Sequence, residues 1–307
     1  MRLTHRLACL LLILAPGRAV AAESPNVVAS IRPIHAIAAA VMEGRGEPAL
    51  LIEGAASPHA YQMRPADAAR LEAADLVFWV GPALELFLTD ALDALAAGKG
   101  LALMDAEGMR LLPNRVAGPF AAEDHDHDHD HSHDPLEMDS HVWLAPANGR
   151  AMARAMAGRL AALDPEGASL YAANAERLAR RLDALEAEIA ARLAPLRDRR
   201  FVVFHDATQY FEDAFGLEAA ASLTLNPARQ PGAKRVAEIR RLIAETGTAC
   251  IFSEPQFPPR LLDVIAEGSE VKRGMLDVVG VELTPGPEHY PQLLLAMADA
   301  MQACLSE

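Results

Sequence analysis

Residues 170–196 read LYAANAERLARRLDALEAEIAARLAPL, and this stretch sets the architecture of the chain. Its apolar series recurs mostly at steps of three and four, with one asparagine among its members: Leu170, Tyr171, Asn174, Leu178, Leu182, Leu185, Ile189, Leu193 and Leu196. This spacing predicts one helix of roughly 25 residues, about 38 Å long at about 1.5 Å per residue. A continuous helix is stiff, unlike a linker rich in glycine and serine. We therefore expect one rigid helix between two lobes.

On either side of that helix, short apolar runs alternate with helical patterns. Six runs are candidate strands: residues 27–31, 49–52, 76–80, 201–204, 249–252 and 271–276. Nearly continuous apolar strands separated by helices, such as 65–73 and 231–245, are typical of parallel sheets covered on both faces. The predicted fold is therefore α/β, with two (β/α) lobes and a ligand site in the cleft between them. No GxGxxG or Walker loop follows a strand, so nucleotide binding is not supported.

The first residues have the features of a secretory signal peptide. Arg2 and Arg6 precede the apolar residues 7–15, and the small residues 19–22 offer a cleavage site. Because the apolar stretch is too short to span a membrane, we expect an exported, periplasmic protein. The predicted parts of the chain are the signal peptide at 1–22, a first lobe at 23–166, a linking helix at 167–194 and a second lobe at 195–307.

The chain is acidic, with 28 Lys and Arg against 42 Asp and Glu and a formal net charge of −14 at pH 7. Such a charge argues against a nucleic-acid partner and suits a surface that attracts cations. We expect a monomer.

Two cysteines lie outside the leader, Cys250 and Cys304. An even pair in an oxidising compartment favours a disulfide, which would tie the C-terminal segment to the start of a strand. Two buried free thiols are the alternative.

A run of alternating histidine and aspartate lies in a segment of about residues 120–139 that shows no apolar periodicity. Its histidines are His125, His127, His129, His131 and His133. Histidine-rich tracts are typical of metal binding, and we expect weak, secondary metal sites here. The plainer alternatives are an expression tag, which the position within the chain argues against, and a solvated acidic loop.

Three isolated histidines and one aspartate share a position beside the ends of predicted elements. His59 lies beyond a strand and before a helix, His205 directly follows the strand at 201–204, and Asp277 follows the strand at 271–276; His141 lies in the sequence HVWLAP. In open α/β sheets, ligands bind beyond the carboxyl ends of strands. Each residue alone is more often structural, but three imidazoles and a carboxylate together suit tetrahedral Zn²⁺.

Two further residues are weaker candidates. Glu254 ends a predicted strand and is a candidate for orienting a metal-bound histidine, since such rings donate their second N–H to an oxygen. A capping or surface role is the alternative for Glu254. We expect His289 at the surface.

Motifs along almost the whole mature chain resemble those of the periplasmic zinc-binding proteins of ABC importers, the ZnuA-like members of the cluster A-I (cluster 9) solute-binding family. They are SPHAY at 57–61, RPAD at 64–67, ADLVFWVGP at 74–82, HVWLAP at 141–146, FHDA at 204–207, NP at 226–227, QPGA at 230–233 and FSEPQF at 252–257. The acidic histidine-rich run before the second ligand segment also resembles the zinc members rather than the manganese ones.

The resemblance implies that His59, His141 and His205 bind zinc and that an inner-membrane ABC permease with a cytoplasmic ATPase takes it up. Asp277 matches the family's C-terminal carboxylate, although LDVVG at 276–280 replaces the usual Leu-Asp-Pro-Leu-Gly. Some zinc members have a glutamate where this chain has Pro58. The fourth ligand is therefore Asp277 or water. The cysteine pair also resembles a disulfide of some members.

Two other functions are compatible with a zinc site. A secreted zinc hydrolase would need an open metal position and a general base, but the chain has no HExxH motif. An extracellular zinc buffer would need only the binding site. In each case the imidazoles must be neutral, so we expect zinc affinity to fall below about pH 6.5.

Overall fold

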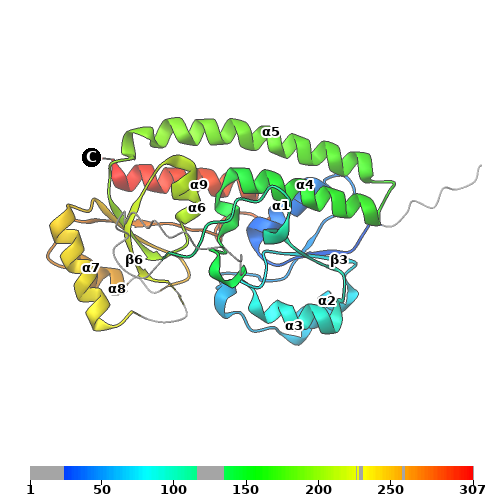
Figure 1. Ribbon diagram of the computed structural model, residues 1–307, viewed down its shortest axis with the longest axis horizontal. Coiled ribbons are helices and arrows are strands. Elements are labelled where there is room, and N and C mark those ends of the chain that lie inside the picture. The colour runs from blue at the N-terminus through cyan, green and yellow to red at the C-terminus, as the bar shows by residue number, and fades with distance from the viewer. Residues whose placement is uncertain (1–23, 116–134, 226, 228–230, 258–259, 307) are drawn as a thin grey trace, which may run out of the picture.

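The computed structural model describes residues 24–115, 135–225, 227, 231–257 and 260–306 (Figure 1). The expected signal peptide at 1–22 lies outside the described residues, and so do the five histidines of the His/Asp run (His125, His127, His129, His131 and His133). No helix within the described ranges is both long and apolar enough to cross a membrane.

The first lobe is built on a four-stranded parallel sheet of order β2-β1-β3-β4. Its strands are β1 (Val27–Ala29), β2 (Ala49–Leu50), β3 (Leu76–Trp79) and β4 (Gly100–Ala102), and its helices are α1 (Arg32–Met42), α2 (Pro65–Ala73) and α3 (Leu86–Leu95). Alternate side chains of β1 pack into different clusters: Val27 lies in the one that contains α1, and Val28 in the one that contains α2 and α3. This alternation explains why the strands are apolar throughout.

The second lobe repeats this plan with a parallel sheet of order β6-β5-β7-β8. Its strands are β5 (Phe201–His205), β6 (Ala219–Thr224), β7 (Cys250–Ser253) and β8 (Lys272–Met275), and its helices are α6 (Gln209–Phe215), α7 (Ala233–Thr246) and α8 (Arg260–Ala266). Val202 and Phe204 pack toward α7 and α8, whereas Phe201 and Val203 pack into the large cluster shared with the first lobe. The predicted α/β fold with two parallel-sheet lobes is confirmed.

Some elements differ from those predicted. The strand expected at 49–52 is only Ala49–Leu50, and β4 and β6 were not anticipated. β6 carries three consecutive alanines, whose preference for helix hides a strand in the sequence; its burial beside β5 decides the outcome. β8 is an exposed edge strand that carries Lys272 and Arg273, charged residues of the kind that discourage edge pairing.

Three long helices lie along the molecule, α4 (Pro146–Leu163), α5 (Ala168–Leu193) and α9 (His289–Leu305). α5 extends over both lobes, and α9 runs beneath it (Figure 1). α9 also contacts α1 of the first lobe, so two helices rather than one connect the halves. One continuous apolar cluster includes residues of β1, α5, β5 and α9. We infer that the lobes are held as a stiff unit, because a shared close-packed core resists sliding.

The beginning of α5 is fixed by a buried polar cluster. The Asp164 carboxylate accepts hydrogen bonds from Arg45 Nε and Nη2, both at 2.8 Å, and from the Tyr171 hydroxyl at 2.7 Å. Gly167 lies against Tyr171, where an added Cβ would come within 2.6 Å of the ring. The turn between α4 and α5 is thereby tied to the first lobe.

A disulfide joins Cys250, the first residue of β7, to Cys304 in the last turn of α9, with their Cα atoms 6.0 Å apart. The predicted pairing is confirmed. The bond links the end of α9 to the centre of the second sheet, and by closing a long loop it stabilises the folded chain, by roughly 2–4 kcal/mol in typical proteins.

Candidate metal centre

The structure brings His59, His141 and His205 together between the lobes. One ring nitrogen from each can be chosen so that all three lie within 4.8 Å of one another. The Nε2 atoms of His59 and His141 are 3.2 Å apart, and the ring of His205 lies 4.7 Å from that of His141 and 5.2 Å from that of His59. Separations of this size allow one ion to contact all three imidazoles at about 2.0–2.1 Å.

Each histidine is held by a different kind of element. His59 lies in a 3-10 turn, η1 (Pro58–Ala60), after β2. His141 precedes a 3-10 turn, η4 (Val142–Leu144), at the start of α4. His205 is the last residue of the central strand β5, so its side chain leaves the carboxyl edge of the second sheet. The position at strand ends is the place expected for a ligand site in this fold class.

Asp139 orients the ring of His141. Its Oδ1 lies 2.7 Å from His141 Nδ1 and also accepts the backbone N–H of His141 at 2.9 Å. In its ionised form the Asp139 carboxylate can only accept, which places the proton on His141 Nδ1 and leaves the lone pair of Nε2 toward the other histidines. Burial raises the pKa of the Asp139 carboxyl to about 7. Burial also lowers the pKa of His141 well below its usual value, which keeps this ring neutral.

Glu254 has the same relation to His205. Its two carboxylate oxygens lie 3.2 and 3.3 Å from His205 Nδ1, and both residues are buried. The structure therefore has the contact that the orienting role considered for Glu254 requires. Burial acts to lower the pKa of His205, but the charge and hydrogen bond of Glu254 outweigh it, and the pKa is raised. His205 Nε2 is buried with no hydrogen-bond partner among the described residues.

His59 is less constrained than the other two rings. It is partly exposed, and within the described part of the chain no carboxylate contacts its Nδ1. Burial and the two neighbouring histidines lower its pKa well below the usual value, so it too is neutral near pH 7. Its loop is supported indirectly, because Asp67 at the start of α2 accepts hydrogen bonds from the Tyr61 hydroxyl (2.8 Å) and from Arg64.

A buried ion-pair network lies beside the histidines and was not anticipated. Arg115, the last described residue before the His/Asp run, donates to Asp206 through Nε at 3.0 Å and to Glu212 through Nη1 at 2.8 Å. Asp206 follows His205 directly. Arg115 therefore ties the first lobe to the second next to the metal centre. In the sequence, the only hint of these two carboxylates was their position: Asp139 lies two residues before His141, and Asp206 directly follows His205.

Asp277 lies apart from the three histidines that could share an ion. Its carboxylate accepts the backbone N–H groups of Gly280 at 2.8 Å, Val279 at 3.3 Å and Val281 at 2.5 Å. His289, expected at the surface, is instead fully buried, and its Nε2 lies 3.0 Å from the carbonyl oxygen of Gly280. That expectation was wrong because α9 is covered by α5 and also packs against α1 and β8.

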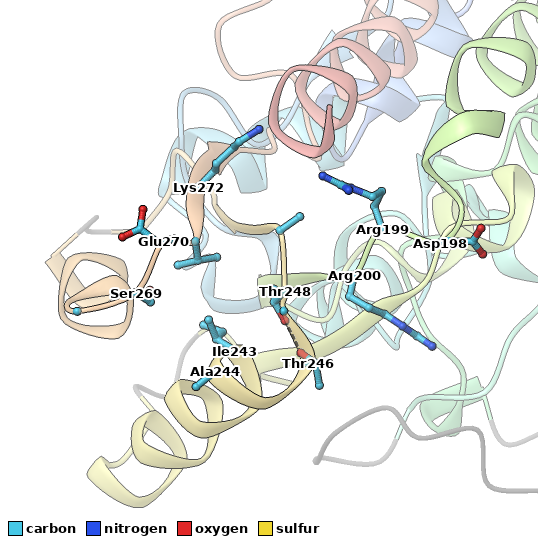
Figure 2. Close-up of a pocket in the computed structure, with 14 residues that line it drawn as sticks. Asp198, Arg199, Arg200, Ile243, Ala244, Thr246, Thr248, Ser269, Glu270 and Lys272 are labelled. Atoms are coloured by element: carbon cyan, nitrogen blue, oxygen red, sulfur yellow. Dashed lines mark hydrogen bonds between the residues drawn. The ribbon is translucent and has the colours of Figure 1, made fainter. Parts of the chain in front are cut away.

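A cavity of about 580 Å³ lies at the opposite edge of the second sheet, around the residues that precede β5, β7 and β8 (Figure 2). Its basic groups already have partners. Lys272 donates to the carbonyl oxygen of Ser306, Arg199 to that of Leu305, and Arg200 pairs with Glu218. We assign this cavity a structural role at the C-terminal end of the chain.

Comparison with known proteins agrees with this site. Residues 27–304 match the family described as ZnuA, zinc-uptake complex component A, periplasmic. The high-affinity zinc uptake system protein ZnuA of Brucella suis is 43% identical, covering 95% of both chains, and that of Paracoccus denitrificans is 39% identical, covering 92% of this chain and 93% of its own.

Solved structures share the fold at low identity. A crystal structure of ZnuA has a TM-score of 0.77 at 22% identity, and the periplasmic zinc-binding protein TroA of Treponema pallidum has a TM-score of 0.76 at 23% identity. Each comparison covers 92% of this chain and 100% of the other. From the match over 27–304 and the identity to curated relatives, the chain belongs to the periplasmic zinc-uptake complex component A family, the ZnuA proteins.

Proposed function

We propose that this protein captures Zn²⁺ in the periplasm and delivers it to an ABC importer for high-affinity zinc uptake. The observation that carries the proposal is the convergence of three imidazoles from both lobes, two of them oriented by buried carboxylates. Family membership supports the same function, since the curated relatives are components of zinc uptake systems.

The ligand set favours zinc over harder cations. His59, His141 and His205 are the proposed ligands, and the fourth position belongs to Asp277 or to water. Three neutral nitrogens and one oxygen suit tetrahedral zinc, whereas Mn²⁺ and Mg²⁺ prefer oxygen ligands and six-coordination. Two of the three rings have a lowered pKa and need lose no proton before binding near pH 7.

Several parts of the proposal rest on the sequence. We propose that residues 1–22 direct export, that residues 23–166 and 195–307 are lobes joined by a helix at 167–194, and that the mature protein is a monomer without a nucleic-acid partner. The histidines of the His/Asp run would bind zinc weakly and raise its concentration near the cleft. The importer partner would be an inner-membrane permease driven by a cytoplasmic ATPase.

A secreted zinc hydrolase gains no support from the family or the site. Catalytic zinc needs a carboxylate or another base free to activate the bound water. Asp139 and Glu254, the carboxylates that touch these histidines, already bond the outer nitrogens of His141 and His205. The site is thus arranged for holding an ion.

The test combines binding with growth. Zinc titration of the mature protein, with and without residues 124–134, should show one tight site in both and weaker sites only when that run is present. A strain that lacks the gene should fail to grow only in zinc-poor medium, and the His141→Ala protein should not restore it. Growth failure that added zinc does not relieve would contradict the proposal. So would loss of the tight site when residues 124–134 are deleted.

A further inference from the structure

The turn at Glu254–Phe257 contributes three side chains beside the metal centre, Glu254, Gln256 and Phe257, of which only Glu254 has a role so far. The turn is closed by a hydrogen bond from the Phe257 N–H to the carbonyl oxygen of Glu254 at 3.2 Å. Phe257 stacks on Phe204 with ring centres 4.6 Å apart, and its ring meets that of His205 edge-on at 6.4 Å. The backbone between these residues, at Gln256, is therefore fixed in place beside His205.

A small cavity separates this turn from the three histidines. Its volume is about 10 Å³, close to the roughly 10–15 Å³ that one water molecule needs. Its lining combines five apolar residues, Pro58, Trp143, Val278, Val279 and Phe257, with the three histidines, Ser57, Glu254 and Gln256. A single small ligand fits there, and a larger hydration shell does not.

Two atoms of residues that line this cavity are buried without hydrogen-bond partners among the described residues. They are Nε2 of His205 and Oε1 of Gln256. Leaving a buried polar atom without a partner is unfavourable, so such atoms usually mark a place where a ligand or water belongs. A cation on His205 Nε2 and a water between that cation and Gln256 would satisfy both.

We propose that Gln256 accepts, through Oε1, a hydrogen bond from a water molecule that completes the coordination of the cation. This inference rests on the proposed function and decides between its two options for the fourth ligand. Asp277 is bound to three backbone N–H groups and does not line the cavity. Both oxygens of Glu254 face His205 Nδ1. Gln256 is then a positioning residue that acts on the metal through water.

The proposal also explains selectivity. On the side of Gln256 there is space for one water, which gives zinc its fourth ligand and leaves no room there for the additional oxygens that six-coordinate Mn²⁺ or Mg²⁺ require. A neutral amide beside that water adds no negative charge, which would otherwise favour harder cations. Gln256 therefore sets both the number and the charge of the oxygen ligands on its own side of the cation.

The experiment compares Gln256→Leu, Gln256→Glu and a matched control, Gln292→Leu, in which the same change is made at an exposed position of α9. Zinc affinity is measured by chelator competition, and Co²⁺ replaces zinc to report coordination through its visible absorption spectrum. We expect Gln256→Leu to weaken zinc binding about 10- to 100-fold, the range for residues that support metal ligands, and to change the Co²⁺ spectrum. Gln292→Leu should match the wild type in both measurements.

Gln256→Glu keeps the shape of the side chain and covers the case in which the leucine variant does not fold. Its carboxylate adds a negative charge beside the water, so the preference for zinc over Mn²⁺ should fall. Unchanged affinity and an unchanged Co²⁺ spectrum in Gln256→Leu, or an unchanged Zn²⁺ to Mn²⁺ preference in Gln256→Glu, would overturn the inference while leaving zinc uptake intact. A wild-type protein that binds no zinc would instead refute the proposed function itself.

Discussion

The two sides of the metal centre are built differently. His141 and His205 are buried, and each has a carboxylate on its outer nitrogen, whereas His59 is partly exposed on a short turn and has no carboxylate partner among the described residues. An oriented ring loses little freedom when it binds a metal, but an unsupported ring must be ordered first. The comparison indicates that His141 and His205 provide a preformed half of the site and that His59 completes it.

The largest effect should come from removing one of the preformed ligands. His141→Ala or His205→Ala should weaken zinc binding by more than about 100-fold, because the loss of a ligand exceeds the 10- to 100-fold effect of losing the group that orients it. Chelator competition measures this directly. The variants should keep the circular dichroism of the wild type; tight binding in either would show that the three-histidine site is wrong.

Removal of His59 should be less damaging, which is the sharpest test of the comparison. Ordering a free side chain takes about 0.5–1.5 kcal/mol, so His59 contributes less net affinity, and His59→Ala should bind zinc up to about tenfold more tightly than His141→Ala. Zinc dissociation followed by stopped flow should likewise be slower in His59→Ala than in His141→Ala. Equal losses in the two variants would remove the distinction between the two sides.

The carboxylates behind the preformed ligands come next. Asp139→Asn and Glu254→Gln keep the shapes of the side chains but remove the charge that fixes each tautomer, so zinc affinity should fall about 10- to 100-fold in each. The same changes at the exposed residues Asp90 and Glu245 are the controls and should have no effect. Wild-type affinity in Asp139→Asn would mean that the contact with His141 has no part in binding.

The pH dependence separates His141 from His205. The pKa of His141 is lowered and that of His205 is raised, so among the three imidazoles His205 is the one whose proton competes with zinc. Protonation of Asp139, whose pKa is raised to about 7, falls in the same pH range. When the pH is lowered, wild-type zinc affinity should already begin to decrease at a pH above 6.5, because the pKa of His205 is raised above that usual value. In Glu254→Gln, burial still lowers the pKa of His205, but the carboxylate charge that raised it is gone. The decrease in zinc affinity should therefore move to lower pH. Titrations from about pH 5 to 8 measure both midpoints, and coincident midpoints would contradict the assignment.

The smallest effect on zinc should come from Asp277. Asp277→Asn should change zinc affinity by no more than about twofold, the scatter typical of residues without shared contacts. The same change should lower the free energy of unfolding by about 1.5–3 kcal/mol, because Asp277 accepts backbone N–H groups as a charged acceptor. Denaturant unfolding of the zinc-free protein tests the second effect. A large loss of zinc binding with unchanged stability would make Asp277 a ligand after all.

Much of the fold was readable in the sequence because its signals are local. The spacing of apolar residues from Leu170 to Leu196 predicted the helix that became α5, and apolar runs predicted β1, β3, β5 and β7. Local signals failed at β6, where alanines favour helix, and at His289, whose burial depends on the packing of α9 against α1 and α5. In both cases long-range packing overrode a local preference.

For the metal centre, the sequence alone determined which residue types were present and at which element ends His59, His141 and His205 stand. Periodicity cannot say which side chains from distant segments face each other, because that depends on how the two sheets and the helices α5 and α9 pack. Only the tertiary structure paired Asp139 with His141 and Glu254 with His205. The same packing left Asp277 on backbone amides and the Gln256 amide oxygen buried beside the site.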